Sequence, residues 1–224
     1  MGNDNKEILP RKVSEKKITE AYSRIARIYD VWAKLTESKA ADRAIELAEI
    51  KDGERILEVA VGTGMLFERI VRMNPGGVNE GIDISPDMLS RAQNRLRRVG
   101  AHNYHLQIGN ARSLPFEAAK FDLVVNNFML DLLPEDSFGV VLSEFSRVLR
   151  SRGRVIISTM TFGNEWYHGF WKWLARHCPA LLTGCRPIHI GFHLQEAGFG
   201  NLTACFVSQN TFPSEVVRAE KMER

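Results

Sequence analysis

Short apolar runs alternate with segments of helical periodicity along most of the chain. The apolar runs predict strands at 56–61, 78–84, 104–108, 121–126, 154–159, 202–208 and 214–219. Around them, apolar side chains recur every three or four positions, which predicts amphipathic helices at 40–50, 65–73, 86–99 and 138–149. Strands that alternate with helices indicate an α/β fold with a largely parallel sheet.

A glycine turn, Gly62-Thr63-Gly64, directly follows the strand at 56–61 and leads into the helix at 65–73. Strand, glycine turn and helix in this order form the nucleotide-binding unit of doubly wound folds, with the ligand at the helix N-terminus. We therefore predict a doubly wound, Rossmann-like sheet of seven strands that is mostly parallel, with an antiparallel C-terminal strand.

Two carboxylates near the turn indicate which kind of nucleotide it binds. The dinucleotide fingerprint fails, because Phe67 occupies the position of its third glycine. Glu58 lies four residues before the first glycine, where a carboxylate suits a ligand with a cationic amino group. Asp83 lies nineteen residues after Gly64, about where a ribose-binding acid belongs. The turn and the two acids together favour a nucleoside with an amino group over one with a pyrophosphate.

Polar side chains also follow the third and fourth predicted strands. Asn110 comes just after the strand at 104–108, and Asn126 and Asn127 end the next one. Open α/β sheets bind ligands at the carboxyl ends of their strands, so these residues are candidate ligand contacts. The alternative for Asn110 is a strand-to-helix turn that merely favours asparagine.

The N-terminal part of the chain predicts a helix ahead of the sheet. Residues 1–13 are polar and expected to be flexible, and we predict a single domain at 14–224. A helical lid is predicted at 14–38, because one helical face carries Ile18, Tyr22, Ile25, Tyr29 and Trp32. The alternative is a helix that only packs on the domain.

The segment 161–190 interrupts the alternation and is rich in aromatic side chains, Trp166 among them. We predict a cap that is inserted after the fifth strand and covers the carboxyl edge of the sheet. Its aromatic side chains suit a lipophilic substrate or a membrane interface. The alternative is an ordinary helix of the core.

Composition narrows the class of protein. The 224 residues are 44% hydrophobic and 25% charged, as in ordinary globular domains. A net charge of +3 does not indicate nucleic acid as a partner, so the arginines at 91–98 and 147–154 are interpreted as solvated surface. The chain has no apolar run of membrane-spanning length, no signal-peptide pattern and three cysteines. We expect a cytoplasmic protein, with peripheral membrane contact as an alternative.

The glycine turn and its acids, together with GIDISPDML, NARSLPF, FDLVVNNFML and EFSRVLRSRGRVIIS, resemble the class I S-adenosylmethionine-dependent methyltransferases. The resemblance covers about residue 40 to the C-terminus. Within the class, these motifs look most like the ubiquinone/menaquinone-biosynthesis C-methyltransferase family. LEVAVGTG is also similar to bacterial phosphatidylethanolamine N-methyltransferases. The chain departs from the quinone family at MLDLL and ISTMTF, where the acceptor is held.

The resemblance implies S-adenosylmethionine as the cofactor and a small, lipophilic acceptor such as a quinone precursor. Phosphatidylethanolamine or another small molecule is the alternative acceptor. The implied cofactor contacts are Tyr22, Glu58, Gly62, Thr63, Gly64, Asp83, Ile84, Met88, Asn110, Ala111 and Asn127. The predicted substrate contacts are Tyr29, Trp32, Asp131, Trp166 and His168. Carbon methylation of a quinol would need a base, and the sequence does not select one among the candidates Asp131, His168 and Tyr29.

Other hypotheses are weaker. An NAD-linked oxidoreductase on the same fold is disfavoured by Phe67, and a cofactor-binding protein without catalysis remains open. Zinc-ligand residue types occur close together, but the chain has no C-x-x-C pair, so no metal is predicted. The residues concerned are Cys178, Cys185, His189 and His193.

Overall fold

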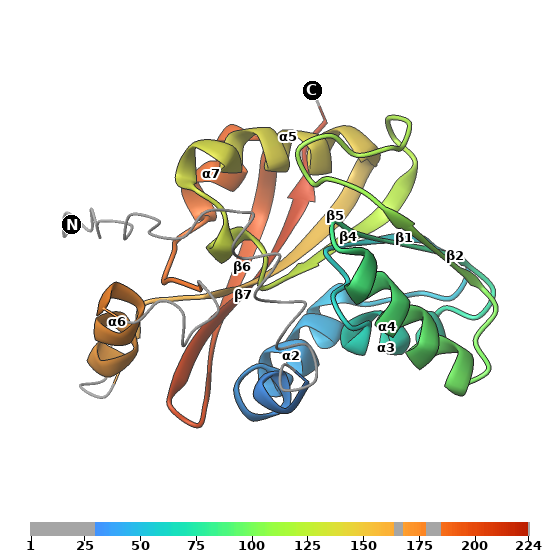
Figure 1. Cartoon of the computed structure of the whole chain (residues 1–224). Coiled ribbons are helices and arrows are strands. Elements are labelled where there is room, and N and C mark those ends of the chain that lie inside the picture. Colours follow the sequence, from blue (N-terminus) through green and yellow to red (C-terminus); the bar gives the residue numbers. More distant parts are fainter. Residues whose placement is uncertain (1–29, 164–167, 178–184, 224) are drawn as a thin grey trace.

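The structure is a computed structural model that describes residues 30–163, 168–177 and 185–223. Within these residues seven strands form one sheet, in the order β3-β2-β1-β4-β5-β7-β6 (Figure 1). β7 runs antiparallel to β5 and β6, while the other strands are parallel, so the predicted sheet is confirmed. The strands are β1 (Arg55–Val59), β2 (Val78–Asp83), β3 (Tyr104–Ile108), β4 (Phe121–Asn127), β5 (Leu149–Met160), β6 (Phe199–Gln209) and β7 (Phe212–Lys221).

Helices cover both faces of the sheet (Figure 1). One face carries α2 (Ser38–Ala48), α3 (Met65–Met73) and α4 (Pro86–Arg98). The other carries α5 (Phe138–Val148) and α7 (Gly191–Glu196). The short 3₁₀ helices η1 (Leu130–Leu132) and η2 (Glu135–Ser137) connect β4 to α5, and α6 (His168–His177) packs beside β7. Residues 30–36 are also helical and lead into α2.

Alternate side chains of the central strands pack into two apolar layers, one on each face of the sheet. In β5, Val155 and Ile157 pack with the α5 and α7 side, whereas Ile156 and Met160 pack with the α2 and α3 side. This alternation follows from the two-residue period of a strand. Because both faces are covered, the central strands are buried over most of their length, which is why they appear in the sequence as continuous apolar runs.

The helix that follows β2 begins as its sequence predicts. Ser85 is the N-cap residue of α4, and its hydroxyl accepts a hydrogen bond from the Met88 N–H at 3.4 Å. Pro86 occupies the first helical position, where its missing N–H costs nothing. The carboxyl end of β2 is thereby fixed to the start of α4.

The fifth strand begins five residues earlier than the predicted Arg154. Arg152 has a φ of 58°, and the pairing between β4 and β5 shifts register between Phe121 and Leu123. Arg152 and Gly153, which directly precede the predicted start, therefore form an irregularity inside a longer strand.

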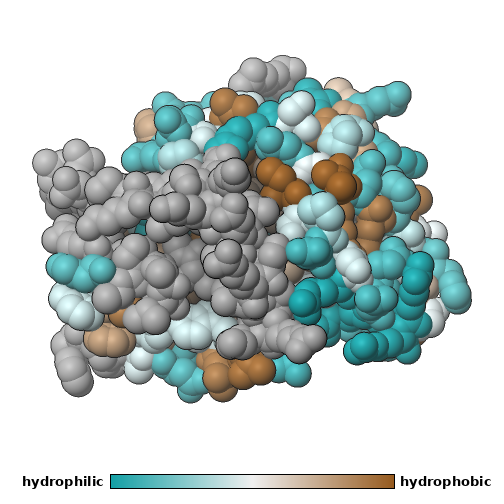
Figure 2. Space-filling view, in the orientation of Figure 1, coloured by the Kyte–Doolittle hydropathy of each residue, from teal (hydrophilic) through white to brown (hydrophobic). Residues whose placement is uncertain are grey.

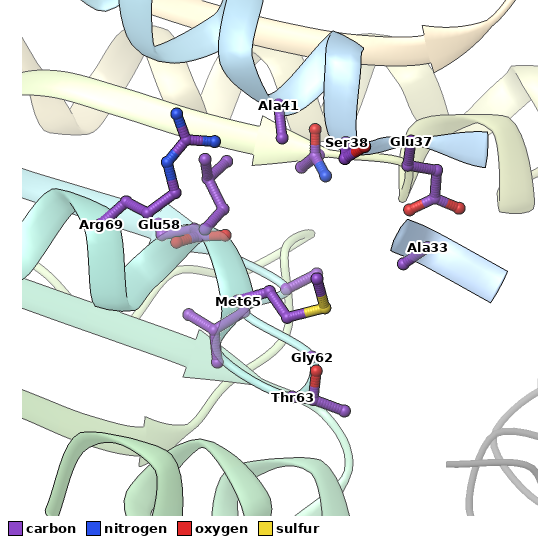
Figure 3. A pocket seen from close by; sticks show the side chains of 13 residues that line it. Ala33, Glu37, Ser38, Ala41, Glu58, Gly62, Thr63, Met65 and Arg69 are labelled. Atoms are coloured by element: carbon purple, nitrogen blue, oxygen red, sulfur yellow. The ribbon is translucent and has the colours of Figure 1, made fainter. Parts of the chain in front are cut away.

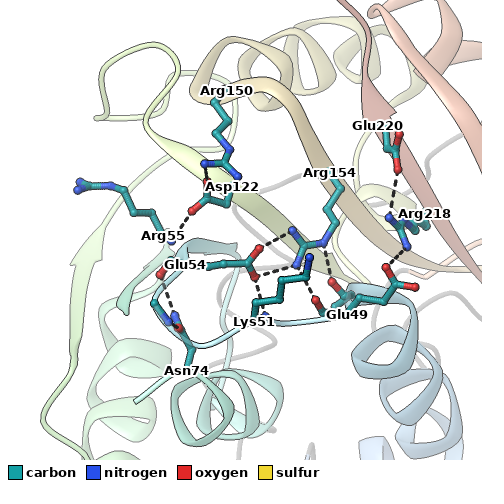
Figure 4. A network of polar contacts seen from close by, with 12 residues as sticks. Glu49, Lys51, Glu54, Arg55, Asn74, Asp122, Arg150, Arg154, Arg218 and Glu220 are labelled. Atoms are coloured by element: carbon teal, nitrogen blue, oxygen red, sulfur yellow. Dashed lines mark hydrogen bonds and ion pairs between the residues drawn. The ribbon is translucent and has the colours of Figure 1, made fainter. Parts of the chain in front are cut away.

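The arginines before and within β5 were expected to be solvated, and for Arg154 this expectation is wrong. Its side chain is 12% exposed and forms two hydrogen bonds of 2.8 Å to the Glu54 carboxylate (Figure 4). It also donates to the carbonyl oxygens of Ala48 and Glu49. Nearby, Arg150 pairs with Asp122 at 2.5 Å. The amino edge of the sheet is thus a polar network that joins α2, β1, β4 and β5.

The outer side of α4 is largely solvated, as predicted. Arg97 and Arg98 are exposed, and the surface over α3 and α4 is mostly hydrophilic in Figure 2. None of the helices in the described part of the chain has the length and apolar character needed to cross a bilayer.

Candidate functional site

A cavity of about 110 Å³ lies between the glycine turn and the helical segment formed by residues 30–36 and α2 (Figure 3). It opens at the carboxyl ends of β1 and β4. The strand order reverses between these two neighbouring strands. From β1 the chain adds β2 and β3 on one side of the sheet, and β4 and β5 then follow on the other side. Doubly wound sheets bind their ligands at this point.

The cavity brings together four of the predicted cofactor contacts and several residues that sequence analysis missed. The predicted ones are Glu58, Gly62, Thr63 and Asn127. The missed ones are Ala33, Glu37, Ser38, Ala41, Ala60, Val61, Met65, Leu66 and Arg69. Those from the helical segment carry no motif, since only the packing of that segment over the turn makes them lining residues.

The two glycines of the turn are needed for different reasons. Both have a positive φ, 54° at Gly62 and 80° at Gly64. A Cβ added at Gly62 would meet nothing within 4 Å, so the backbone there is open to a ligand. A Cβ at Gly64 would lie 2.9 Å from the Ala92 Cβ, so Gly64 also permits close packing of α3 on α4.

Glu58 supplies a buried acid to the cavity. Its side chain is 2% exposed, and its Oε2 atom has no hydrogen-bond partner among the described residues. Burial, and after it the charge of Asp83, raises the pKa of Glu58 well above its usual value. An ionised carboxylate in this position needs a cationic partner, so the site is suited to an ammonium group.

Asp83 holds the glycine turn in place. It is 7% exposed, its Oδ2 accepts from the Gly62 N–H at 2.8 Å, and its Oδ1 accepts from the Ser85 N–H at 2.9 Å. Burial raises its pKa, and the backbone hydrogen bonds oppose that rise. Asp83 lies beside the cavity rather than in its lining, and its predicted contact with a ribose stays a prediction.

The remaining predicted cofactor contacts lie along the carboxyl ends of β2 and β3. Asn110 is exposed, and its Oδ1 accepts from the Arg112 N–H at 2.9 Å, so its side chain stabilises the local turn. Ala111 follows it and is partly buried. Ile84 is 54% exposed whereas Met88 is 3% exposed, so Ile84 presents the apolar surface at this edge. Their adenine contacts stay predictions.

Several buried side-chain oxygens at the carboxyl edge lack a partner among the described residues. Four of them share one face of the sheet, because Asn127 lies opposite Ser158 in register, and Ser214 lies opposite Met160, two residues further along β5. Glu58 lies on the same face of β1. The atoms are Glu58 Oε2, Asn127 Oδ1, Ser158 Oγ and Ser214 Oγ. No sequence motif marked the two serines.

Arg95 was expected on the solvated side of α4, and this expectation is wrong. Its Nε atom donates to the Thr63 carbonyl oxygen at 2.9 Å, and its Nη2 atom donates to Asp30 Oδ2 at 2.6 Å. Arg95 thereby connects α4 to the glycine turn and to the helix at residues 30–36.

Of the predicted substrate contacts, the structure describes two side chains. Trp32 packs edge-on against Trp171 and Phe212, with centroid separations of 6.2 and 6.3 Å, and is not in the cavity lining. Asp131 lies in η1 and is not in the cavity lining either. Tyr22, Tyr29, Trp166 and the side chain of His168 lie outside the described residues.

Asp131 is a fully buried acid after β4. Its Oδ2 accepts from the Met160 N–H at 3.0 Å, and Cys185 forms a hydrogen bond to it. Burial raises its pKa to about 7, against the opposing effects of the Met160 N–H and the charge of Arg186. Asp131 therefore joins η1 to the end of β5 and to the segment that leads into α7.

Of the four zinc-ligand residue types, Cys178 lies outside the described residues, and the other three do not converge. Cys185 forms a hydrogen bond to Asp131, His189 packs on Phe162, and His193 packs edge-on against Phe138. Across residues 30–163, 168–177 and 185–223, no three His, Cys, Asp or Glu side chains are grouped to hold a metal ion.

Comparison with known proteins identifies the class. Residues 56–153 match the family described as "Methyltransferase domain". A phosphatidylethanolamine N-methyltransferase from Cereibacter sphaeroides is 35% identical over 145 residues, covering 62% of this chain and 66% of that protein. A demethylmenaquinone methyltransferase from Lactococcus lactis is 33% identical over 150 residues, covering 65% and 59%. The chain thus spans about two thirds or less of the length of these relatives.

A solved structure shows the same fold at low identity. The [4+2]-cyclase SpnF has a TM-score of 0.75 and 16% identity, covering 96% of this chain and 99% of that chain. The family match and these relatives support the predicted class for the matched domain, the class I S-adenosylmethionine-dependent methyltransferases. S-adenosylmethionine is the cofactor of that class.

Proposed function

We propose that this protein transfers the methyl group of S-adenosylmethionine to a small, lipophilic acceptor such as a quinone precursor. The observation that carries the proposal is Glu58, a buried carboxyl in the cavity where the strand order reverses, with one oxygen that has no partner among the described residues. An ammonium group is the partner that such a carboxyl needs, and S-adenosylmethionine carries one on its methionine end.

The residues of the site fit the cofactor. Glu58 would hold the ammonium group, the open space at Gly62 would admit the ligand close to the backbone, and Asp83 would hold the ribose. The bound cofactor supplies a methyl group on a sulfonium, which is already a good leaving group. The chain's main task is therefore to position an acceptor and to exclude water.

The nature of the acceptor is supported by the relatives and by aromatic side chains. Relatives named for demethylmenaquinone and phosphatidylethanolamine both suggest a lipid-like molecule. On α6, Phe170 and Trp173 are 56% and 52% exposed and stack with centroids 6.3 Å apart. This pair favours contact with a lipophilic acceptor or a membrane surface, as part of the cap at 161–190.

A second candidate is methylation of a phospholipid amine. Glu37 is a second acid in the cavity lining and is 4% exposed. A relative named phosphatidylethanolamine N-methyltransferase supports this candidate. In either case the predicted lid at 14–38 would cover the site, with Ala33, Glu37 and Ser38 lining the cavity.

Transfer of labelled methyl from S-adenosylmethionine into a total lipid extract, resolved by chromatography, tests the proposal. Label in a quinone band supports the first acceptor, and label in phospholipid supports the second. Glu58→Gln is the control, because it should abolish most of the label in either band. Cofactor binding without transfer to any lipid would contradict a lipophilic acceptor, and no cofactor binding would contradict the whole proposal.

A further inference from the structure

Three side chains join the helix at residues 30–36 to the glycine turn. The Thr63 hydroxyl donates to Asp30 Oδ1 at 2.6 Å. Arg95 Nη2 donates to Asp30 Oδ2 at 2.6 Å, and Arg95 Nε donates to the Thr63 carbonyl oxygen at 2.9 Å. A carboxylate from one helix and a guanidinium from α4 thus hold both the side chain and the backbone of Thr63.

The glycine turn depends on contacts from outside itself. Ala60, Gly62 and Gly64 all have a positive φ, a conformation that a free chain rarely adopts three times within five residues. Asp83 holds the Gly62 N–H from the sheet side. Asp30 and Arg95 hold the next residue, Thr63, which lines the cavity.

The helix at residues 30–36 and the start of α2, which line one side of the cavity, are held at two places. At the C-terminal end of this segment, Gln209 donates to the Lys34 carbonyl oxygen at 2.7 Å and accepts from the Lys39 N–H at 2.7 Å. At its other end, the described contact with the turn is made by Asp30. Breaking only the Asp30 contact would leave the Gln209 end anchored, so the segment would loosen over the cavity without unfolding the domain.

We propose that Asp30 and Arg95 are positioning residues that clamp the N-terminal helix and the glycine turn around the cofactor. Neither residue needs to touch the ligand, since both act through Thr63. The ion pair is partly open to solvent, with 34% of the Asp30 and 27% of the Arg95 side chain exposed. The clamp is therefore weakened by salt and can open while the apolar core stays intact. The identity of the ligand rests on the proposed function.

The test combines cofactor affinity with amide hydrogen exchange. In Asp30→Ala the dissociation constant for S-adenosylmethionine, measured by calorimetry, should rise about tenfold, the size expected for loss of charge-assisted hydrogen bonds. Arg95→Ala should give a similar rise, and the double variant should be no worse than the weaker-binding single one. In the ligand-free protein, amides of residues 62–66 should exchange faster in Asp30→Ala while Tm stays unchanged.

Matched variants separate the clamp from a general structural effect. Thr63→Val removes the hydroxyl and should weaken binding, whereas Thr63→Ser should restore it. Glu46→Gln breaks the exposed Arg43–Glu46 pair, 2.8 Å long, on α2 and should leave both affinity and exchange unchanged. Raising the salt concentration should weaken binding more in the wild type than in the double variant.

Wild-type affinity together with wild-type exchange in Asp30→Ala would overturn the clamp. So would faster exchange spread over the whole sheet with a lower Tm, because that result means a general structural role. Absence of S-adenosylmethionine binding in the wild type would instead overturn the proposed function, and the exchange of the ligand-free protein would still decide whether the clamp exists.

Discussion

The amino and carboxyl edges of the sheet both contain buried polar side chains, but these side chains are satisfied to different degrees. At the amino edge, Arg154 and Glu54 form a two-bond ion pair, and Asp122 accepts from the Arg55 N–H and pairs with Arg150 (Figure 4). At the carboxyl edge, Glu58, Asn127, Ser158 and Ser214 each keep an oxygen without a partner among the described residues.

We infer from this difference that the amino edge is structural and that the carboxyl edge binds a ligand. A buried polar group without a partner costs free energy, so folding alone would not favour a row of them. A ligand that supplies the missing partners recovers that cost on binding. We therefore expect changes at the amino edge to alter stability and changes at the carboxyl edge to alter binding or pH dependence.

The largest effect is expected from Asp131, the buried acid at the carboxyl edge. Its pKa is raised from 3.8 to about 7 in the folded protein, so the folded state binds the proton more tightly than the unfolded state. That stabilisation is complete below about pH 4 and is lost as the pH rises through 7, by up to about 4 kcal/mol. Urea denaturation between pH 4.5 and 8.5 should show this decline, and Asp131→Asn should flatten it. Equal slopes in the two proteins would contradict the assignment.

Next in size is Arg154→Ala at the amino edge. The substitution leaves Glu54, also 12% exposed, without its guanidinium partner, so the free energy of unfolding should fall by about 3 kcal/mol. The dissociation constant for S-adenosylmethionine should not change. Arg152→Ala is the matched control, because its pair with Glu223 is 81% and 62% exposed and should matter little. A change in cofactor affinity in Arg154→Ala would break the division between the two edges.

Glu58→Gln should have the opposite effect to Arg154→Ala: it should weaken cofactor binding without lowering stability. Loss of a charged hydrogen bond to the cofactor ammonium should raise the dissociation constant between about tenfold and a hundredfold. Stability should hold or increase, because the neutral amide avoids the cost of a buried carboxylate. Since the pKa of Glu58 is raised, wild-type affinity should increase with pH as the carboxyl ionises, and the variant should lose that dependence. Calorimetry at several pH values measures the affinity and its pH dependence in both proteins. A variant that binds like the wild type would show that Glu58 is not part of the site.

The smallest effect is expected at Ala60, which has a φ of 63° at the edge of the cavity. Glycine adopts this conformation without strain, so Ala60→Gly should stabilise the protein by up to about 1 kcal/mol. Ala44→Gly inside α2 is the control and should destabilise by about 1 kcal/mol or more. A lower Tm in Ala60→Gly would show that the alanine methyl packs usefully despite its backbone.

The main features of the fold could be predicted from local sequence. All seven strands were placed within a few residues, because buried parallel strands are continuous apolar runs. The start of α4 followed from Ser85 and Pro86, which act through local geometry. The early start of β5 was missed, since its irregular residues around Arg152 pair through long-range contacts with β4.

The candidate site, like the fold, was predicted only where its residues are close together in the sequence. Glu58, Gly62 and Thr63 were found because strand, turn and acid are adjacent in sequence, and the structure places them in one cavity. Arg95 and Arg154 were misjudged as solvated, because an arginine on a helix or strand shows no local sign of a distant carboxylate.

The sequence by itself determined the class of fold, the glycine turn and the acid proposed to hold the cofactor, since each depends on residues close together in the chain. Only the tertiary structure decided what surrounds that turn. Asp30 and Arg95 are 65 residues apart, and Asn127 and Ser158 meet only through strand register. Such contacts arise when distant segments pack, and no local pattern of hydrophobic and polar positions encodes them.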